Sequence, residues 1–173
     1  MRYLENTFHE TLYTIGVDIW SSIYIKNEEK IKIDFFDTSG LNRFDSIVKS
    51  YLKRAQGAIF VFSFDNRKSF DSIKYWIEMY KSAKHRTRTT MLLLGNKCDL
   101  LNQEVTFIEG EMLGMQLGIE FFKVSSKTGD GIINAFSSFI EKIIDPSKPI
   151  ENKLKLRLRS KKHVRNKNKI CQT

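Results

Sequence analysis

Two nearly continuous apolar runs, Ala58–Phe64 and Thr90–Leu94, constrain the fold of this chain more than any other feature. Runs of this kind are typical of β-strands whose two faces are both buried. Between them, apolar residues recur at steps of three and four over positions 70–80, which predicts a helix, and Asp65 or Asn66 is suited to cap its start. A strand, a helix and a second buried strand in this order indicate parallel strands joined by a crossover helix.

Further strand and helix patterns lie on both sides of this unit. The apolar runs Ile23–Ile25 and Ile31–Phe36 flank a short polar turn and predict an antiparallel hairpin. Later positions predict a helix over 108–117, a strand over 120–124 and a helix over 132–144. A length of 173 residues fits one domain. We therefore expect a layered α/β fold with a mostly parallel sheet.

The net charge of +9 is concentrated at one end of the chain. Residues 151–173 contain nine Lys or Arg and one acid, a net charge of +8, which leaves +1 for residues 1–150. A protein that is basic all over, such as a histone-like DNA coater, is thereby excluded. No aromatic residue interleaves the basic ones, so we expect no DNA partner. We interpret residues 1–145 as the folded domain and residues 146–173 as a basic, disordered tail.

Cysteine and histidine usage favours a reducing compartment. Cys98 and Cys171 are too few for a disulfide framework, and three scattered His residues give no zinc-ligand spacing. Positions 1–6 lack the apolar stretch of a signal peptide, and no window approaches the roughly 18 apolar residues that span a bilayer. We therefore expect a cytoplasmic protein.

A polar segment, Asn96-Lys97-Cys98-Asp99, follows the second buried strand. Open α/β sheets bind ligands at this end of their strands. The Asp99 carboxylate can accept hydrogen bonds from N1 and N2 of guanine, a donor pair that adenine lacks. Asn96 can bond N7 and brace the loop, while the Lys97 stem can lie over the ring. Such a site rejects the wrong base because polar groups would be left unpaired. The alternative is an ordinary polar turn after a strand.

Two further segments at predicted strand ends complete a nucleotide pattern. After the strand over 120–124, a backbone N–H can reach the guanine O6, and the candidates there are Ser125, Ser126 and Lys127. After the hairpin, Asp37 can hold Mg²⁺ through water, the Gly40 N–H can reach a γ-phosphate, and the Thr14 hydroxyl can join the same ion. The order Asp-x-x-Gly, Asn-Lys-x-Asp and Ser-x-Lys, each at a strand end, is specific as a set.

With these three elements the chain resembles a Rab small GTPase of the Ras superfamily. Other segments similar to those of Rab proteins are Ile15–Ile19, Ile31–Phe35, Arg43–Ile47, Tyr51–Ala55 and Ile59–Phe64. The match runs from about Arg2 to Ile144. The resemblance implies a Ras-like P-loop NTPase three-layer fold, binding of GTP or GDP with Mg²⁺, and the role of a switch in vesicle and membrane trafficking.

The resemblance also implies a set of partners. Effector proteins would contact an apolar surface formed by Ile19, Phe36 and Tyr51, although Ile19 replaces the usual Phe. Without the family, these three side chains would be interpreted as half-buried packing. An exchange factor and an escort of the GDP-dissociation-inhibitor type are the other expected partners. We expect the chain to be a monomer.

The phosphate side departs from the family pattern. A small GTPase opens with a strand and Gly-x-x-x-x-Gly-Lys-[Ser/Thr], whereas the first glycine here is Gly16, already past the start of the first switch. The first strand and the P-loop are thus missing, which favours a truncated form or an incomplete gene model over a functional short isoform. In the family that strand lies mid-sheet, between the strands here at about 31–36 and 57–64. We therefore expect an interrupted sheet with two open inner edges.

The catalytic position departs as well. Leu41 stands where the family has the Gln that orients the attacking water. Leucine has no donor or acceptor for that task, so no catalytic group is intact and GTP hydrolysis is expected to be slow or absent. Two other functions remain open: a non-catalytic pseudo-GTPase scaffold that binds effectors, and a basic-tailed membrane adaptor.

The tail predicts attachment to a membrane. Its basic residues can bind anionic lipid, and Cys171 near the end is a candidate for prenylation, so two signals would act together. Cys171 is third from the end, however, whereas the C-a-a-X motif needs Cys in fourth place. A solvated charge run with an incidental Cys is the alternative. We expect a peripheral location on the cytoplasmic face of an internal membrane.

Overall fold

The computed structural model describes residues 2–9, 14–83 and 89–145 of the chain. The predicted tail over 146–173, with Cys171, lies outside the described residues. No helix among the described residues is long and apolar enough to cross a lipid bilayer.

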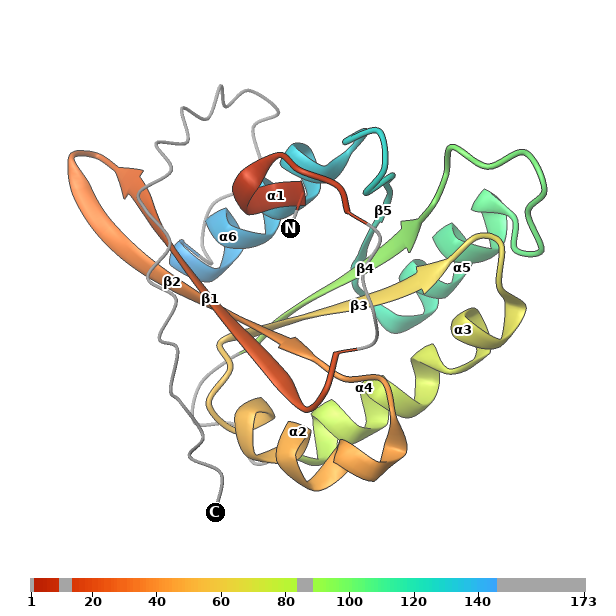
Figure 1. Cartoon of the computed structure of the whole chain (residues 1–173), viewed down its shortest axis with the longest axis horizontal. Helices are drawn as coiled ribbons and strands as arrows, with labels where there is room; N and C mark the ends of the chain where they lie inside the picture. The colour runs from red at the N-terminus through yellow and green to blue at the C-terminus, as the bar shows by residue number, and fades with distance from the viewer. Residues whose placement is uncertain (1, 10–13, 84–88, 146–173) are drawn as a thin grey trace, which may run out of the picture.

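Within the described part of the chain, five strands form two separate sheets (Figure 1). The strands β1 (Val17–Lys26) and β2 (Glu29–Thr38) pair as an antiparallel hairpin, which is longer at both ends than the sequence predicts. Its two-residue turn, at positions 27 and 28, has positive φ angles of 49° and 69°, the conformation that matches the twist of the strands. The other sheet is parallel, in the order β3-β4-β5. Its strands are β3 (Gly57–Ser63), β4 (Thr90–Asn96) and β5 (Glu120–Lys123).

The predicted crossover helix is divided in two. Asn66, rather than Asp65, caps its start, and its side chain accepts a hydrogen bond from the backbone N–H of Ser69. Ser72 then ends α3 (Arg67–Asp71) and precedes α4 (Ile73–Ser82). The two later helices lie close to the expected positions: α5 (Phe107–Leu117) and α6 (Ile132–Ile144). The sequence did not predict α1 (Arg2–Glu5), the 3-10 turn η1 (Asn42–Phe44) or α2 (Asp45–Leu52).

Helices cover both faces of the parallel sheet, which confirms the three-layer α/β architecture (Figure 1). Along β4, Leu92 and Leu94 pack with α1 and α6, while Leu93 packs with α4 and α5. These three leucines are at most 3% exposed. Alternating side chains therefore face two different cores, and this explains why the strand is a continuous apolar run.

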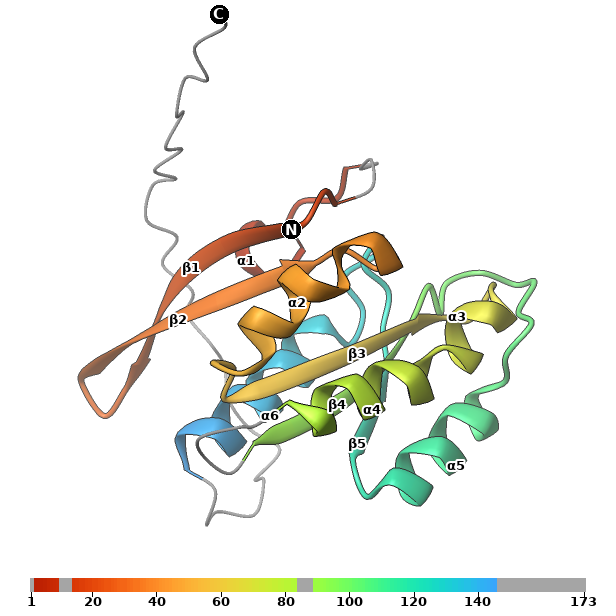
Figure 2. The same ribbon diagram turned by 90° about the horizontal axis from the view of Figure 1, so that it is seen from below.

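The expected interruption of the sheet lies between β2 and β3, and no strand pairing joins them within the described residues. The hairpin is attached by side chains instead. Ile33 and Phe35 pack on the core around α6. The Tyr24 hydroxyl donates a hydrogen bond to Glu141 of α6, and Lys26 Nζ lies 2.8 Å from Glu141 Oε2. The tip of the hairpin extends away from the three-stranded sheet (Figure 2).

Candidate functional site

The loops that follow β4 and β5 are joined at the carboxyl ends of these strands. The backbone N–H of Cys98 donates to the Val124 carbonyl at 3.1 Å, and the N–H of Val124 donates to the Gly95 carbonyl at 2.8 Å. Lys97 adopts a positive φ of 62°. This left-handed residue turns the chain sharply after β4, so that Asn96 and Asp99 lie beside the loop that starts at Ser125.

Two side-chain contacts lock these loops together. Asn96 Oδ1 accepts hydrogen bonds from the backbone N–H of Ser126 at 3.0 Å and from its hydroxyl at 3.1 Å. The hydroxyl of Ser125, a fully buried residue, donates to Asp99 Oδ1 at 2.6 Å. This hydrogen bond lowers the pKa of Asp99, because it favours the ionised carboxyl group. Asp99 is exposed. An ionised acceptor is therefore fixed in place at the mouth of the two loops.

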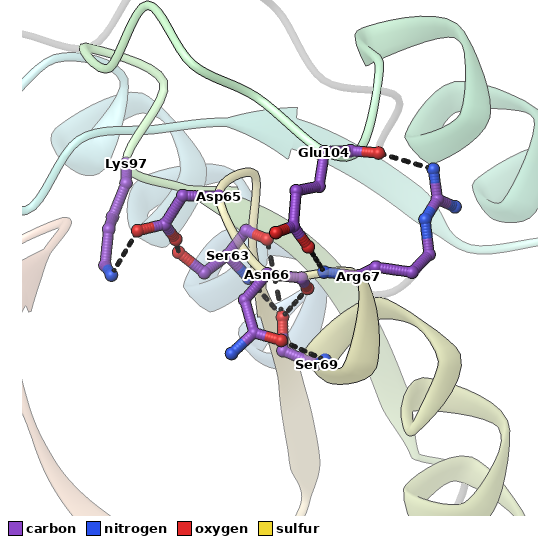
Figure 3. A network of polar contacts seen from close by, with 7 residues as sticks. All are labelled: Ser63, Asp65, Asn66, Arg67, Ser69, Lys97 and Glu104. Atoms are coloured by element: carbon purple, nitrogen blue, oxygen red, sulfur yellow. Dashed lines mark hydrogen bonds and ion pairs between the residues drawn. The ribbon is translucent and has the colours of Figure 1, made fainter.

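Lys97 extends toward the end of β3 instead of across these loops (Figure 3). Its Nζ lies 2.9 Å from Asp65 Oδ2, and Asp65 also accepts a hydrogen bond from the Ser63 hydroxyl. The Ser63 bond first, and then Lys97, lower the pKa of Asp65. The stem of Lys97 is thereby held along one side of the loop after β4.

The same network connects the start of α3 to the loop before α5 (Figure 3). The backbone N–H of Arg67 donates to Glu104 Oε2 at 2.7 Å, and its guanidinium donates to the Glu104 carbonyl at 2.6 Å. The Ser69 hydroxyl accepts a hydrogen bond from the Ser63 N–H at 2.9 Å. The ends of β3 and β4 are therefore braced from both sides.

The candidates for phosphate and Mg²⁺ are less tightly arranged. Asp37 lies directly across the hairpin from Asp18, and loss of solvent around its carboxyl group, followed by the charge of Asp18, raises its pKa. Gly40 is exposed, and Thr14 is half-buried. No hydrogen bond joins Thr14, Asp37 and Gly40 within the described residues. In the same part of the chain, no group of three or more His, Cys, Asp or Glu residues is placed to hold a metal ion.

Leu41 lies in a shallow surface depression after β2. A cavity of about 620 Å³ is lined by Gly40, Leu41, Asn42 and Arg43. Ser39 directly precedes this depression; it is buried, and its backbone N–H donates to the Gly16 carbonyl at 2.8 Å. Leucine offers neither an acid nor a base in this depression, and the charged side chain among the lining residues is that of Arg43.

The three candidate effector residues meet on one surface. Ile19 and Phe36 are partners in the register of the hairpin, and the rings of Phe36 and Tyr51 are 5.1 Å apart. Ile19 is 56% exposed. An apolar surface thus connects β1, β2 and α2.

Sequence reasoning missed one residue that reaches the loop after β5. Arg2, in α1, donates from Nε to the Ser126 carbonyl at 2.8 Å and from Nη2 to the Lys127 carbonyl. No local pattern in the sequence identifies this contact, because 124 positions separate Arg2 from Ser126.

Sequence comparison relates the chain to known proteins. A sequence model of the family described as "Ras family" matches residues 1–145. The Ras-related protein Rab-3C of Bos taurus is 32% identical over 146 residues, which are 83% of this chain and 64% of that protein. The Ras-related protein Rab-18 of Lymnaea stagnalis is 34% identical over 145 residues, 83% of this chain and 72% of that protein. Human Rab-39A is 36% identical over 126 residues, 72% of this chain and 58% of that protein. The chain thus spans less than two thirds of two of these relatives.

Proposed function

The chain belongs to the Ras family, as a divergent Rab-type protein, and on this premise we propose that it binds guanine nucleotides through the loops that follow β4 and β5. One observation carries the proposal: the buried Ser125 hydroxyl holds the ionised Asp99 carboxylate at 2.6 Å, while Asn96 secures Ser126. A carboxylate fixed before the ligand arrives binds the N1 and N2 donors of guanine without the cost of being ordered.

The residues present fit the two halves of a nucleotide unequally. The base half has a preformed set of contacts. On the phosphate side, the Gly40 N–H, Thr14 and Asp37 would hold the γ-phosphate and Mg²⁺, but these 173 residues carry no Gly-x-x-x-x-Gly-Lys-[Ser/Thr] segment. A bound Mg²⁺ would neutralise phosphate charge. We therefore expect this chain to hold GDP or GTP mainly through the base, and the apolar Leu41 leaves hydrolysis slow or absent.

The cellular role that we propose is a trafficking switch on an internal membrane. Ile19, Phe36 and Tyr51 would bind effectors, and an exchange factor and an escort protein would act on the domain at 1–145. The basic residues at 146–173, with Cys171 as a candidate lipid site, would hold it at the cytoplasmic face.

A pseudo-GTPase scaffold is the second candidate function. The observation that favours it is the contact between Phe36 and Tyr51, whose rings lie 5.1 Å apart. Both rings belong to the chain itself, and a scaffold would present them to an effector without using the nucleotide.

Thermal unfolding of the full chain with added nucleotides separates the two functions. We expect GDP and GTP to raise Tm in a Mg²⁺-dependent way, and ATP to leave it unchanged. Stabilisation by neither guanine nucleotide would contradict the switch and favour the scaffold. The variant Asp99→Asn is a matched control, because it replaces an acceptor of the N2 donor by an amide donor. We expect this variant to lose its response to GDP and to respond to xanthosine diphosphate, whose C2 carbonyl accepts a hydrogen bond.

A further inference from the structure

Arg2 connects the first helix of the described chain to the loop after β5. Its guanidinium donates from Nε to the Ser126 carbonyl at 2.8 Å and from Nη2 to the next carbonyl, that of Lys127. The stem lies against Gly129, where an added Cβ would be 3.7 Å from Arg2 Cδ. One side chain therefore holds two successive carbonyls of the loop through charge-assisted hydrogen bonds.

The neighbours of Arg2 fix its position. Tyr3 is buried, and its ring is stacked 4.4 Å from that of Phe136 in α6. On the other side, Arg2 Nη1 donates to the Asn6 carbonyl at 3.0 Å, and the backbone N–H of Asn6 returns a bond to the Arg2 carbonyl. Tyr3 thus anchors α1 to the core, and Asn6, directly after α1, holds the Arg2 guanidinium in a fixed orientation.

The amide groups of this loop are nearly all engaged. The N–H of Ser125 donates to the Asp130 carbonyl, and that of Ser126 donates to Asn96 Oδ1. The N–H of Thr128 donates to the Ser125 hydroxyl, and the N–H of Gly129 donates to the Ser125 carbonyl. Lys127 is different: its N–H has no partner within the described residues, and the residue is exposed. In this exposed residue an N–H donor thus remains that no described group engages, next to Ser125 and Ser126, which bond to Asp99 and Asn96.

We propose that Arg2 is a positioning residue that aims the Lys127 N–H at the O6 of a bound guanine. The carbonyl of Ser126 and the N–H of Lys127 belong to one trans peptide group, so they point in opposite directions. A guanidinium that holds the carbonyl therefore directs the N–H away from α1, and its charge polarises the same peptide group. Ser126 cannot supply this donor while its own N–H is bound to Asn96. The inference rests on the proposed binding of guanine nucleotides.

The test compares three variants of the full chain: Arg2→Met, Arg2→Lys and the control Lys74→Met. The control removes one positive charge from an exposed position of α4. Two readouts are used for each protein. Amide hydrogen exchange at Thr128 and Gly129 reports the order of the loop without nucleotide. The ratio of the Kd for 6-thioguanosine diphosphate to the Kd for GDP reports the contact with O6, because sulfur is a weaker acceptor than oxygen while N1 and N2 are unchanged.

In Arg2→Met we expect amide exchange at Thr128 and Gly129 to accelerate. The Kd ratio should fall toward one by about fivefold, the factor that one hydrogen bond contributes. Arg2→Lys should fail to restore the ratio, because an ammonium lacks the fork that spans two carbonyls. Lys74→Met should match the wild type. A wild-type Kd ratio that persists in Arg2→Met overturns the inference. If the wild-type chain binds no guanine nucleotide, the proposed function fails, and unchanged exchange in Arg2→Met would show separately that Arg2 does not order the loop.

Discussion

The Ser125 hydroxyl holds two parts of the proposed guanine-binding site at once. It donates to Asp99 Oδ1 at 2.6 Å and accepts from the backbone N–H of Thr128 at 3.1 Å. Because Ser125 is fully buried, water does not replace a bond that is lost there. The serine therefore couples the charge of Asp99 to the shape of the neighbouring loop.

We expect Ser125→Ala to weaken GDP binding about tenfold, because Asp99 loses its fixed orientation and Thr128 loses its acceptor. Isothermal titration of GDP into both proteins measures the change. The control is Ser137→Ala in α6, where the hydroxyl bonds only within its own helix, to the Ile133 carbonyl. Equal GDP affinity in Ser125→Ala and the wild type would contradict the role given to Ser125.

Glu109 provides a prediction about pH. The pKa of Glu109 is lowered from 4.5 to about 2. The largest cause is Arg67, whose Nη1 lies 2.7 Å from Glu109 Oε1, and the N–H and hydroxyl of Thr106 follow. A carboxyl group with a lower pKa in the folded state stabilises the fold above its unfolded pKa, and this contribution is lost as the group becomes protonated. The loss is therefore expected between pH 4.5 and about 2.

Urea unfolding at a series of pH values tests this. Between pH 4.5 and 2, the free energy of unfolding should fall more steeply in the wild type than in Glu109→Gln, which has no carboxyl group to protonate. Glu111→Gln, at an exposed position of the same helix, should follow the wild-type profile. Parallel profiles for Glu109→Gln and the wild type would refute the assignment.

At the scale of elements, the hairpin depends on α6 for its attachment. Tyr24, which is buried, and Lys26 both contact Glu141 through their polar ends. The apolar side chains of β2 pack on the core around α6. Burial and Glu141 raise the pKa of Tyr24, as expected for a phenol that donates to a carboxylate. Side chains thus attach the hairpin to the rest of the domain, whereas backbone hydrogen bonds join the strands within each sheet.

We therefore expect Glu141→Ala to lower the free energy of unfolding by about 2 kcal/mol, since the buried Tyr24 hydroxyl loses this acceptor and Lys26 its partner. Urea unfolding measures the loss. Glu78→Ala, at an exposed position of α4, is the control and should change stability little. Similar small losses in the two variants would mean that α6 does not anchor the hairpin through Glu141.

At the scale of the molecule, no backbone pairing joins β2 to β3 within the described residues, and an added strand can test what its insertion between them would change. A β-strand and a Gly-x-x-x-x-Gly-Lys-Ser segment fused ahead of Met1 should raise GTP affinity, because the loop adds backbone donors and a lysine for the phosphates. Single-turnover hydrolysis should remain slow in this fusion. Leu41→Gln in the same fusion should accelerate it about 100-fold by positioning the water. Brisk hydrolysis with Leu41 in place would contradict the role of that position.

The charge distribution makes a prediction for the whole chain. The full chain should sediment with liposomes that contain anionic lipid, and residues 1–150 alone should not, because each basic residue near the surface contributes about 1 kcal/mol. Binding should weaken as salt is added. Leu154, Leu156 and Leu158 alternate with basic residues of the tail, and replacing them by Ser keeps the charge and measures any apolar contribution to membrane binding. Equal binding to uncharged liposomes would refute an electrostatic role for the tail.

Local patterns were sufficient for much of the fold. The apolar runs predicted β3 and β4. The helix expected over 108–117 agrees with α5, which ends at Gly118, where this glycine adopts a φ of +66°. They were not sufficient for α1, which has four residues, too few to show a helical period. The division of the crossover helix at Ser72 was also missed, because the apolar spacing continues through it.

Periodicity and motif spacing are local properties of the chain, and they were enough to predict the strands β1 to β5, the helices α5 and α6, and the polar residues at strand ends. The contacts between distant segments are visible in the tertiary structure alone: Arg2 holds the Ser126 carbonyl, and Asn96 accepts a hydrogen bond from Ser126. Arg2 and Asn96 are 124 and 30 positions from Ser126. Contacts over such separations depend on how the crossover helices stack on the sheet, and no short window of sequence contains that information.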